Sequence, residues 1–185
     1  FREGEVDYAA LERLVEWHIG EGTDGLVPVG TTGESPTLSM EEHKEVIRFV
    51  VKQASGRIPV MAGTGGNSTT EAVELTKFAA EVNADSALLV SPYYNKPEPE
   101  GMYRHFRAVA EAADIPLVLY NVPSRTGREI ALESVFRLSE IKGFVGIKEA
   151  GGSTDRVSEI ARRTRLDVLS GDDSMTLPFM AVGAK

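Results

Sequence analysis

Cysteine is absent from the 185-residue sequence, so neither a disulfide framework nor a thiolate metal site can form. No apolar run approaches the roughly 20 residues that a membrane-spanning helix needs, and we expect no signal peptide. Basic clusters are missing as well, and a formal net charge of −8 repels the phosphates of nucleic acids. We therefore expect a cytoplasmic protein without membrane or nucleic-acid partners, whose ligand is a small metabolite.

The composition that is present is ordinary for a globular protein, with 42% hydrophobic and 26% charged residues. A chain of this length builds one sizeable core, so residues 1–185 are expected to form a single domain. No group of His, Asp and Glu has the spacing of a metal site. Asp172 and Asp173 follow a predicted strand as an isolated acidic pair, and we expect them to cap the next helix.

Apolar, β-branched runs alternate with amphipathic stretches along the whole chain. The apolar runs predict strands over residues 25–29, 58–62, 86–90, 117–120, 144–148 and 167–169. The amphipathic stretches predict helices over residues 8–19, 40–54, 70–82, 101–113, 132–141, 156–163 and 175–182. Ser39 with Glu42, and Ser68 with Glu71, have the spacing of capping boxes at two helix starts.

The predicted strands recur at intervals of roughly 23 to 34 residues and are apolar throughout, as parallel strands covered on both faces are. This pattern fits a doubly wound open sheet or a (β/α)8 barrel, and no Gly-x-Gly-x-x-Gly follows the first strand. Polar motifs follow the strands directly, which favours the barrel because its active site is built from these loops. Only six strands are found, so we expect the second to the seventh strand of an incomplete barrel, in a piece of a longer protein.

Lys148 is a charged residue where a buried strand usually has none, directly after the apolar run 143–147. Burying an ammonium without a partner is costly, and a lysine in such a place becomes a nucleophilic amine with a lowered pKa. An amine of that kind attacks carbonyl carbon to form a Schiff base. On this residue alone, a lysine whose head reaches water at the strand end explains the pattern equally well.

Six motifs, one of them around Lys148, each follow or end a predicted strand. They are Gly-Thr-Thr-Gly-Glu-Ser at 30–35, Gly-Thr-Gly at 63–65, Ser-Pro-Tyr-Tyr-Asn-Lys-Pro at 91–97, Tyr-Asn-Val-Pro-Ser-Arg-Thr-Gly at 120–127, Gly-Ile-Lys-Glu-Ala at 146–150 and Ser-Gly-Asp-Asp at 170–173. In this order, and over essentially the whole chain, they resemble the motifs of the pyruvate-dependent class I aldolase family. The resemblance implies a (β/α)8 barrel that needs no cofactor and no metal.

Within that family, the motifs are similar to those of members that condense pyruvate with L-aspartate 4-semialdehyde to 4-hydroxy-tetrahydrodipicolinate, the committed step of diaminopimelate and lysine biosynthesis. The resemblance makes Lys148 the Schiff-base lysine and Tyr120 its general acid/base. It makes Tyr94 and Thr31 the rest of a proton relay, in which the relay tyrosine comes from a second subunit. A homo-oligomer, a dimer of dimers, is therefore implied. Since Tyr120 and Lys148 end successive strands, we expect them about 4.8 Å apart.

Substrate binding is assigned by the same resemblance to Thr32 and Gly33 for the pyruvate carboxylate, and to Gly171. Arg125 corresponds to the arginine that holds the carboxylate of the semialdehyde. A guanidinium offers a planar fork that matches a carboxylate, although an arginine on a loop is more commonly a surface residue.

L-Lysine inhibits some members of the family at a site across a subunit interface. The corresponding positions here include Ser35, His43, Asn67, Glu71 and Tyr93. Glu71 can pair with the ammonium of the ligand, while Asn67 and Tyr93 can donate to its carboxylate. The alternative role for Glu71 is to complement the N-terminus of its own helix.

Two other functions stay open at this point. Keto-deoxy-sugar-acid aldolases and N-acetylneuraminate lyase share the lysine and the tyrosine and differ in the aldehyde pocket, and the segments 93–97 and 123–127 favour the condensation with aspartate semialdehyde. The second alternative is a non-catalytic barrel that binds a keto acid or an amino acid as a sensor. A sensor has no use for a proton relay, so the combination of Thr31, Tyr94, Tyr120 and Lys148 speaks against it.

Overall fold

A parallel sheet of five strands forms the centre of the computed structural model, which describes all residues 1–185. The strands are β1 (Met61–Gly63), β2 (Ser86–Val90), β3 (Leu117–Asn121), β4 (Phe144–Glu149) and β5 (Asp167–Ser170). Each strand pairs in parallel with the next strand along the chain. This sequential order is that of the staves of a β/α barrel.

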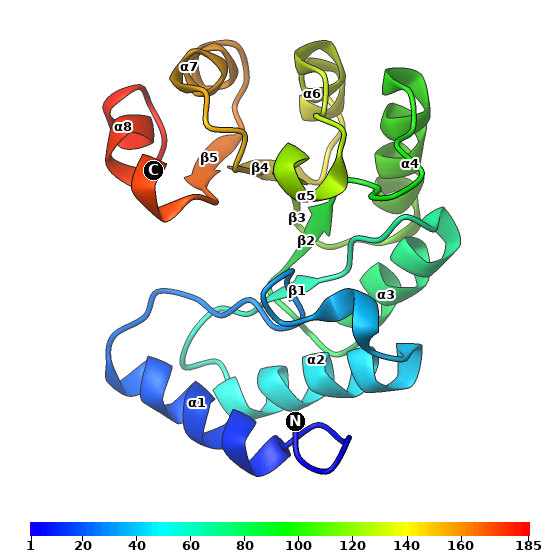
Figure 1. Ribbon diagram of the computed structural model, residues 1–185, viewed down its shortest axis with the longest axis vertical. Helices are drawn as coiled ribbons and strands as arrows, with labels where there is room; N and C mark the ends of the chain where they lie inside the picture. The colour runs from blue at the N-terminus through cyan, green and yellow to red at the C-terminus, as the bar shows by residue number, and fades with distance from the viewer.

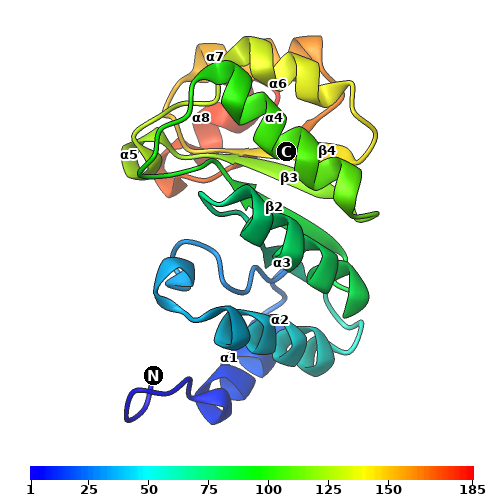
Figure 2. The same cartoon turned by 90° about the vertical axis from the view of Figure 1, so that its right-hand side faces the viewer.

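Helices cover one face of the sheet in an arc that is open between α1 and α8 (Figure 1). They are α1 (Tyr8–Gly20), α2 (Met40–Ala54), α3 (Thr69–Glu81), α4 (Pro99–Ala112), α5 (Pro123–Thr126), α6 (Leu132–Ser139), α7 (Thr154–Arg163) and α8 (Thr176–Ala181), with short 3-10 helices η1 (Ser35–Thr37) and η2 (Asp173–Met175). In the turned view of Figure 2, α3 and α4 lie along the outer side of the sheet. None of the helices combines the length and the apolar character that crossing a bilayer requires.

Capping side chains set several helix starts. Ser39 and Glu42 form the predicted capping box, with the Ser39 N–H donating to Glu42 at 2.8 Å and the Glu42 N–H donating to Ser39 at 3.2 Å. Ser68 accepts from the Glu71 N–H at 3.4 Å, but the reciprocal bond is not formed, so the second predicted box is only half correct. Asp172 caps η2, as expected for the acidic pair, by accepting from the Ser174 N–H at 3.1 Å.

The predicted strand 25–29 is wrong as a regular strand. Leu26 forms an isolated parallel bridge with Val60, and the Gly63 N–H donates the last bond between the two segments, to the Pro28 carbonyl at 3.0 Å. Pro28 has no N–H to donate, and Val29 turns into the left-handed region with φ 49°, so the ladder of hydrogen bonds ends there. The strand predicted over 58–62 lies at Met61–Gly63 as β1, and five regular strands replace the expected six.

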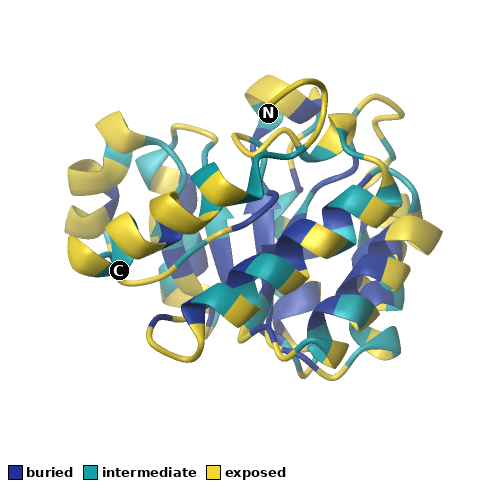
Figure 3. Cartoon of the chain, turned by 90° about the horizontal axis from the view of Figure 1, so that it is seen from below, coloured by how far each residue is buried: buried dark blue, intermediate teal, exposed yellow.

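The two faces of the sheet carry separate apolar clusters. Leu89 and Leu119 belong to a cluster of 30 buried residues between the sheet and the helices. Leu88, Val118 and Tyr120 belong to a smaller cluster of 4 on the inner face. Successive side chains of a strand point to opposite faces of the sheet, and side chains in register on neighbouring strands point to the same face. The residues paired with Leu88, Val118 and Tyr120 on neighbouring strands therefore also point inward. Figure 3 shows the buried strands within helices whose outer sides are exposed.

Candidate active site

Lys148 and Tyr120 stand side by side at the carboxyl edge of the sheet. They are direct partners in the parallel register of β3 and β4, and both are on the inner face. The Nζ atom of Lys148 lies 4.5 Å from the centroid of the Tyr120 ring. The predicted adjacency of these two residues is confirmed.

The surroundings of the pair change the proton affinity of both groups. Burial lowers the pKa of Lys148 below its ordinary value of 10.5, against the opposing charge of Asp173. Burial raises the pKa of Tyr120 above 10.0, and the Thr31 hydroxyl and the Arg125 guanidinium partly offset this effect. Lys148 therefore releases its proton more readily than a free lysine, while Tyr120 holds its own at neutral pH. A nucleophilic amine next to a proton donor is the arrangement that imine formation requires.

Thr31 lies close to Tyr120, where Gly63 lets the chain at Val29 and Gly30 come close to β1. Thr31 and Tyr120 line the same narrow cavity of about 10 Å³. A Cβ atom on Gly63 would lie 2.3 Å from the Val29 carbonyl oxygen, and one on Gly65 would lie 2.2 Å from the Val90 nitrogen. A side chain at Gly63 would push Val29 away from β1, and one at Gly65 would clash with the backbone of β2, which explains the Gly-Thr-Gly motif physically.

Gly171 lies against the side chain of Lys148. A Cβ atom at Gly171 would lie 3.0 Å from Cε of Lys148 and 2.9 Å from Cβ of Ala150. The Gly171 N–H donates to the Glu149 carbonyl at 2.8 Å, which holds the loop after β5 close to the end of β4. Glycine therefore leaves room for the lysine, while the predicted contact with substrate stays a prediction.

The other residues predicted for the site lie around this cluster. Arg125, on α5, is exposed, although its charge acts on the pKa of Tyr120. Thr32 is exposed, and Gly33 lines an apolar hollow of about 390 Å³ beside α1. Tyr94 is 90% exposed with φ 70° and lies outside the cluster.

A separate polar hollow of about 240 Å³ gathers most of the predicted lysine site. Four of its lining residues were predicted for that site: Ser35, His43, Glu71 and Tyr93. Burial raises the pKa of Tyr93, and the charge of Glu71 raises it further. Burial lowers the pKa of His43, whose Nε2 is 2.7 Å from the Gly63 carbonyl oxygen, so this ring is a neutral wall of the hollow. Asn67 does not line it, and its backbone carbonyl accepts from Nδ2 of Asn95 at 3.3 Å.

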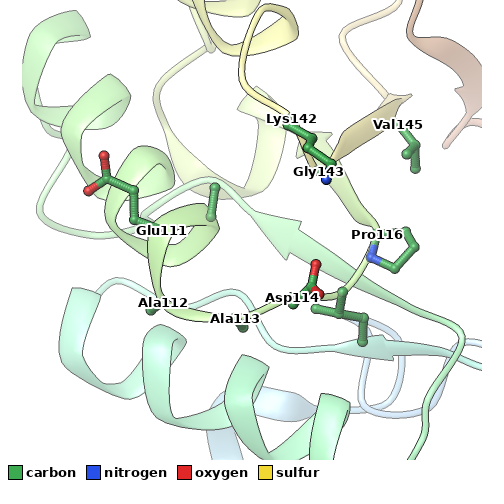
Figure 4. A pocket seen from close by; sticks show the side chains of 10 residues that line it. Glu111, Ala112, Ala113, Asp114, Pro116, Lys142, Gly143 and Val145 are labelled. Atoms are coloured by element: carbon green, nitrogen blue, oxygen red, sulfur yellow. The ribbon is translucent and has the colours of Figure 1, made fainter.

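The largest hollow lies at the opposite end of the sheet. It has a volume of about 620 Å³ and is lined by residues 110–116 with Lys142, Gly143 and Val145, beside the starts of β3 and β4 (Figure 4). None of the predicted site residues lines it. Because β/α barrels carry their chemistry at the carboxyl ends of the strands, the position of Lys148 identifies the site better than cavity size does.

Three buried residues behind the pair were not indicated by the sequence patterns. Asn121, Glu149 and Arg156 form a hydrogen-bonded cluster on the helix side of the sheet. Glu149 was the one visible signal of this cluster in the sequence, because it is a second charged residue in the same apolar strand as Lys148.

The fold and the pair of side chains define a class of protein, a β/α barrel with a lysine amine beside a tyrosine at the carboxyl edge of its sheet. The chain belongs to the dihydrodipicolinate synthetase family, whose model matches residues 1–185. The family resemblance and the predicted fold class are thereby confirmed.

Relatives and solved structures are similar to the chain over its whole length. The 4-hydroxy-tetrahydrodipicolinate synthase of Aquifex aeolicus (strain VF5) is 57% identical over 188 residues, which cover 100% of this chain and 64% of that protein. The crystal structure of dihydrodipicolinate synthase from Aquifex aeolicus matches with a TM-score of 0.98 at 57% identity, over 100% of this chain and 64% of that one. The chain thus spans 64% of the length of these relatives.

Two further solved structures were determined with small molecules. The chloride-inhibited dihydrodipicolinate synthase from Acinetobacter baumannii, in complex with pyruvate, is 52% identical with a TM-score of 0.95, over 100% of this chain and 64% of that one. The synthase from Cyanidioschyzon merolae with lysine bound is 41% identical with a TM-score of 0.96, over the same shares of 100% and 64%.

Proposed function

We propose that the protein to which this chain belongs condenses pyruvate with L-aspartate 4-semialdehyde to 4-hydroxy-tetrahydrodipicolinate. The observation that carries the proposal is the half-buried amine of Lys148, 4.5 Å from the ring centroid of Tyr120 at the carboxyl edge of the sheet. The relative from Aquifex aeolicus, at 57% identity, is named for this product, and the synthase from Acinetobacter baumannii was solved with pyruvate. Both support pyruvate as the first substrate.

The reaction begins with the neutral amine of Lys148. It attacks C2 of pyruvate, forming a C–N bond while the carbonyl oxygen gains a proton, and this oxygen leaves as water after a second protonation. The resulting iminium draws electrons from the methyl carbon, which loses a proton and becomes an enamine. Tyr120 is placed to donate and accept these protons.

The enamine carbon then bonds to the aldehyde carbon of the semialdehyde, whose oxygen takes up a proton. The amino group of the second substrate displaces Lys148 at C2, which closes the ring and regenerates the free amine. Thr32 and Gly33 are proposed to hold the pyruvate carboxylate through the free N–H groups of their loop. Thr31 and Tyr94 are proposed to complete the proton relay from Tyr120.

The proposed reaction is tested by the choice of aldehyde. Full-length protein should consume pyruvate rapidly with L-aspartate 4-semialdehyde and should not cleave N-acetylneuraminate or keto-deoxy sugar acids. Cleavage of a sugar acid at a comparable rate would favour another aldolase of the superfamily. Pyruvate binding without turnover of any aldehyde would favour a sensor.

A homo-oligomer, a dimer of dimers, is proposed together with this function. Tyr94 is 90% exposed in the single chain, so a second subunit can reach it. The mass of the full-length protein in solution tests this proposal, and a monomer that retains full activity would contradict a relay that crosses a subunit interface. The cytoplasmic location stays a prediction.

Arg125→Ala should weaken the use of the semialdehyde without preventing formation of the pyruvate adduct. Arg125 is exposed on α5 near Tyr120, where its guanidinium can pair with a second carboxylate. Losing such a charged contact costs about 10- to 100-fold in kcat/KM for the semialdehyde. Steady-state kinetics and adduct mass measure the two effects separately. A collapse of adduct formation would instead place Arg125 in the pyruvate site.

L-Lysine is proposed to inhibit the protein partially at the hollow lined by Ser35, His43, Glu71 and Tyr93. Glu71 supplies the negative charge that an ammonium requires, and the synthase from Cyanidioschyzon merolae was solved with lysine bound. Glu71→Ala should therefore weaken inhibition by about 10-fold or more while activity without lysine stays unchanged. Dose–response curves on wild type and variant measure this. Wild-type activity unchanged by millimolar lysine would show that the hollow is not a lysine site.

A further inference from the structure

A buried polar cluster lies directly behind Lys148 and Tyr120, on the opposite face of the sheet. Asn121 and Glu149 follow these two residues and are partners in the same parallel register. Because successive side chains of a strand point to opposite faces, Asn121 and Glu149 point toward the helices. Both are completely buried at 0% exposure, and Nδ2 of Asn121 donates to Oε1 of Glu149 at 2.6 Å. The ends of β3 and β4 are thus joined by side chains as well as by the sheet.

Arg156 of α7 supplies the charge that balances Glu149. Its Nε donates to Oε2 of Glu149 at 2.8 Å, and its side chain is only 5% exposed. The Gly151 N–H donates to Oε1 of the same carboxylate at 2.9 Å. The carboxylate therefore accepts three hydrogen bonds, one of them from a buried cation, and such partners offset the cost of burying a charge.

The same cluster anchors the segment that leaves α5, the helix of Arg125. The Ile130 N–H donates to Oδ1 of Asn121 at 3.0 Å, and the Ile130 carbonyl accepts from Nη2 of Arg156 at 2.6 Å. Both backbone groups of Ile130 are therefore held by the cluster. One polar group thus joins the ends of two strands, the start of α7 and the segment that follows α5.

We propose that Asn121, Glu149 and Arg156 are positioning residues, which fix the ends of β3 and β4 so that the Lys148 amine and the Tyr120 hydroxyl keep the geometry needed for imine formation. This inference rests on the proposed function of Lys148 as the nucleophile. Stability alone does not call for such a cluster, since well-packed apolar side chains often serve a core as well as a buried ion pair does. Reacting groups, in contrast, lose rate when they move by a fraction of an ångström, and a rigid hydrogen-bonded shell prevents that movement.

Two variants weaken the cluster without leaving a buried charge alone. Asn121→Ala removes the link between β3 and β4 and keeps the Glu149–Arg156 pair. Arg156→Lys keeps the positive charge, but one ammonium on a flexible stem cannot reproduce the fork that reaches both Glu149 and Ile130.

Ser139→Ala is the matched control. Ser139 is also buried, and its hydroxyl donates to the Phe136 carbonyl at 2.7 Å. It lies at the end of α6, near the start of β4 and away from Lys148. A hydrogen bond lost here affects folding stability without touching the site.

The measurement is the rate constant of adduct formation between full-length protein and pyruvate, trapped with borohydride, over a range of pH and below the melting temperature of each variant. Asn121→Ala and Arg156→Lys should lower this rate constant by about 10- to 100-fold at an undiminished final yield. The pH of half-maximal rate should move up, because a loosened Lys148 is better hydrated and its pKa returns toward the ordinary value. Ser139→Ala should stay within about twofold of wild type, whatever its melting temperature.

Rate constants within about twofold of wild type in both cluster variants would overturn the positioning role. The positioning role would also be overturned if the rate constant of adduct formation stayed unchanged and only the adduct yield fell, in proportion to the fraction of unfolded protein. That outcome would be a purely structural effect. If Asn121→Ala does not fold, Arg156→Lys decides the question by the same readout. A wild-type protein without an adduct on Lys148 would overturn the proposed function and this inference together, whereas a normal wild-type adduct with unaffected variants overturns only the inference.

Discussion

Lys148→Ala is expected to abolish the covalent adduct with pyruvate and all detectable condensation. The imine requires a primary amine, and the alanine side chain has none. Full-length wild-type protein, treated with pyruvate and borohydride, should gain the mass of one reduced pyruvate on the peptide that contains Lys148. The variant should gain none.

Lys142→Ala is the matched control for this experiment. Lys142 lies just before β4, the strand of Lys148, beside the hollow at the amino-terminal ends of the strands. Its removal should leave adduct and turnover unchanged, because it is on the end of the sheet opposite to Lys148. An adduct mapped to Lys142, or to Lys96 in the loop after β2, would contradict the assignment of Lys148 as the nucleophile.

Adduct formation should also depend on pH in a direction set by burial. Only the neutral amine attacks the carbonyl, so the rate rises as the pH increases through the pKa of Lys148. Burial lowers that pKa from its ordinary value of 10.5, which places the half-maximal rate below pH 10.5. Asp173→Asn should move it lower still, because the carboxylate of Asp173 raises the pKa of Lys148.

Much of the fold and the central pair could be predicted from the sequence, because parallel strands leave strong local signals. Buried strands are apolar over their whole length, and the one lysine at the end of such a run marked the carboxyl edge of β4. The parallel register then brought Tyr120 opposite Lys148 without further information. Serine caps likewise gave the start of α2, where both bonds of the capping box form.

The prediction of a regular strand over 25–29 is wrong because regular pairing depends on backbone donors and φ angles, which an apolar pattern does not reveal. Leu26, Val27 and Val29 read as a strand, yet Pro28 withholds a donor and Val29 takes a positive φ. After that departure the chain passes close to Gly63, and Thr31 lines the same narrow cavity as Tyr120. The apolar pattern of residues 25–29 therefore gives a wrong prediction at the segment that leads into the candidate active site.

The cluster behind the pair could not be assembled from the sequence, since its members are far apart along the chain. Asn121 and Arg156 are polar residues of ordinary appearance in a strand end and in a helix. Only the register of β3 and β4 and the packing of α7 bring them both to Glu149. A buried acid in an apolar strand predicts that some partner exists, but does not say which element provides it.

Tyr120→Phe is expected to preserve the fold and to slow turnover by about 10²- to 10⁴-fold, the usual contribution of one acid/base group. The ring packs in the inner cluster with Leu88, Val118 and Val122, and phenylalanine keeps these contacts. Burial raises the pKa of Tyr120 above 10.0, so the wild-type hydroxyl stays protonated at neutral pH and the variant loses a proton donor there.

The variant should still bind pyruvate, and its Lys148 should form the adduct slowly, which separates loss of proton transfer from loss of the nucleophile. Tyr8→Phe removes a hydroxyl from a half-buried ring on α1, which packs on Phe49 at a centroid distance of 5.0 Å, and should leave turnover unchanged. Steady-state rates, with thermal melting to establish folding, measure both variants. Turnover of Tyr120→Phe within about twofold of wild type would mean that another group moves the proton, and Thr31, on the other wall of the same narrow cavity, would be the next residue to substitute.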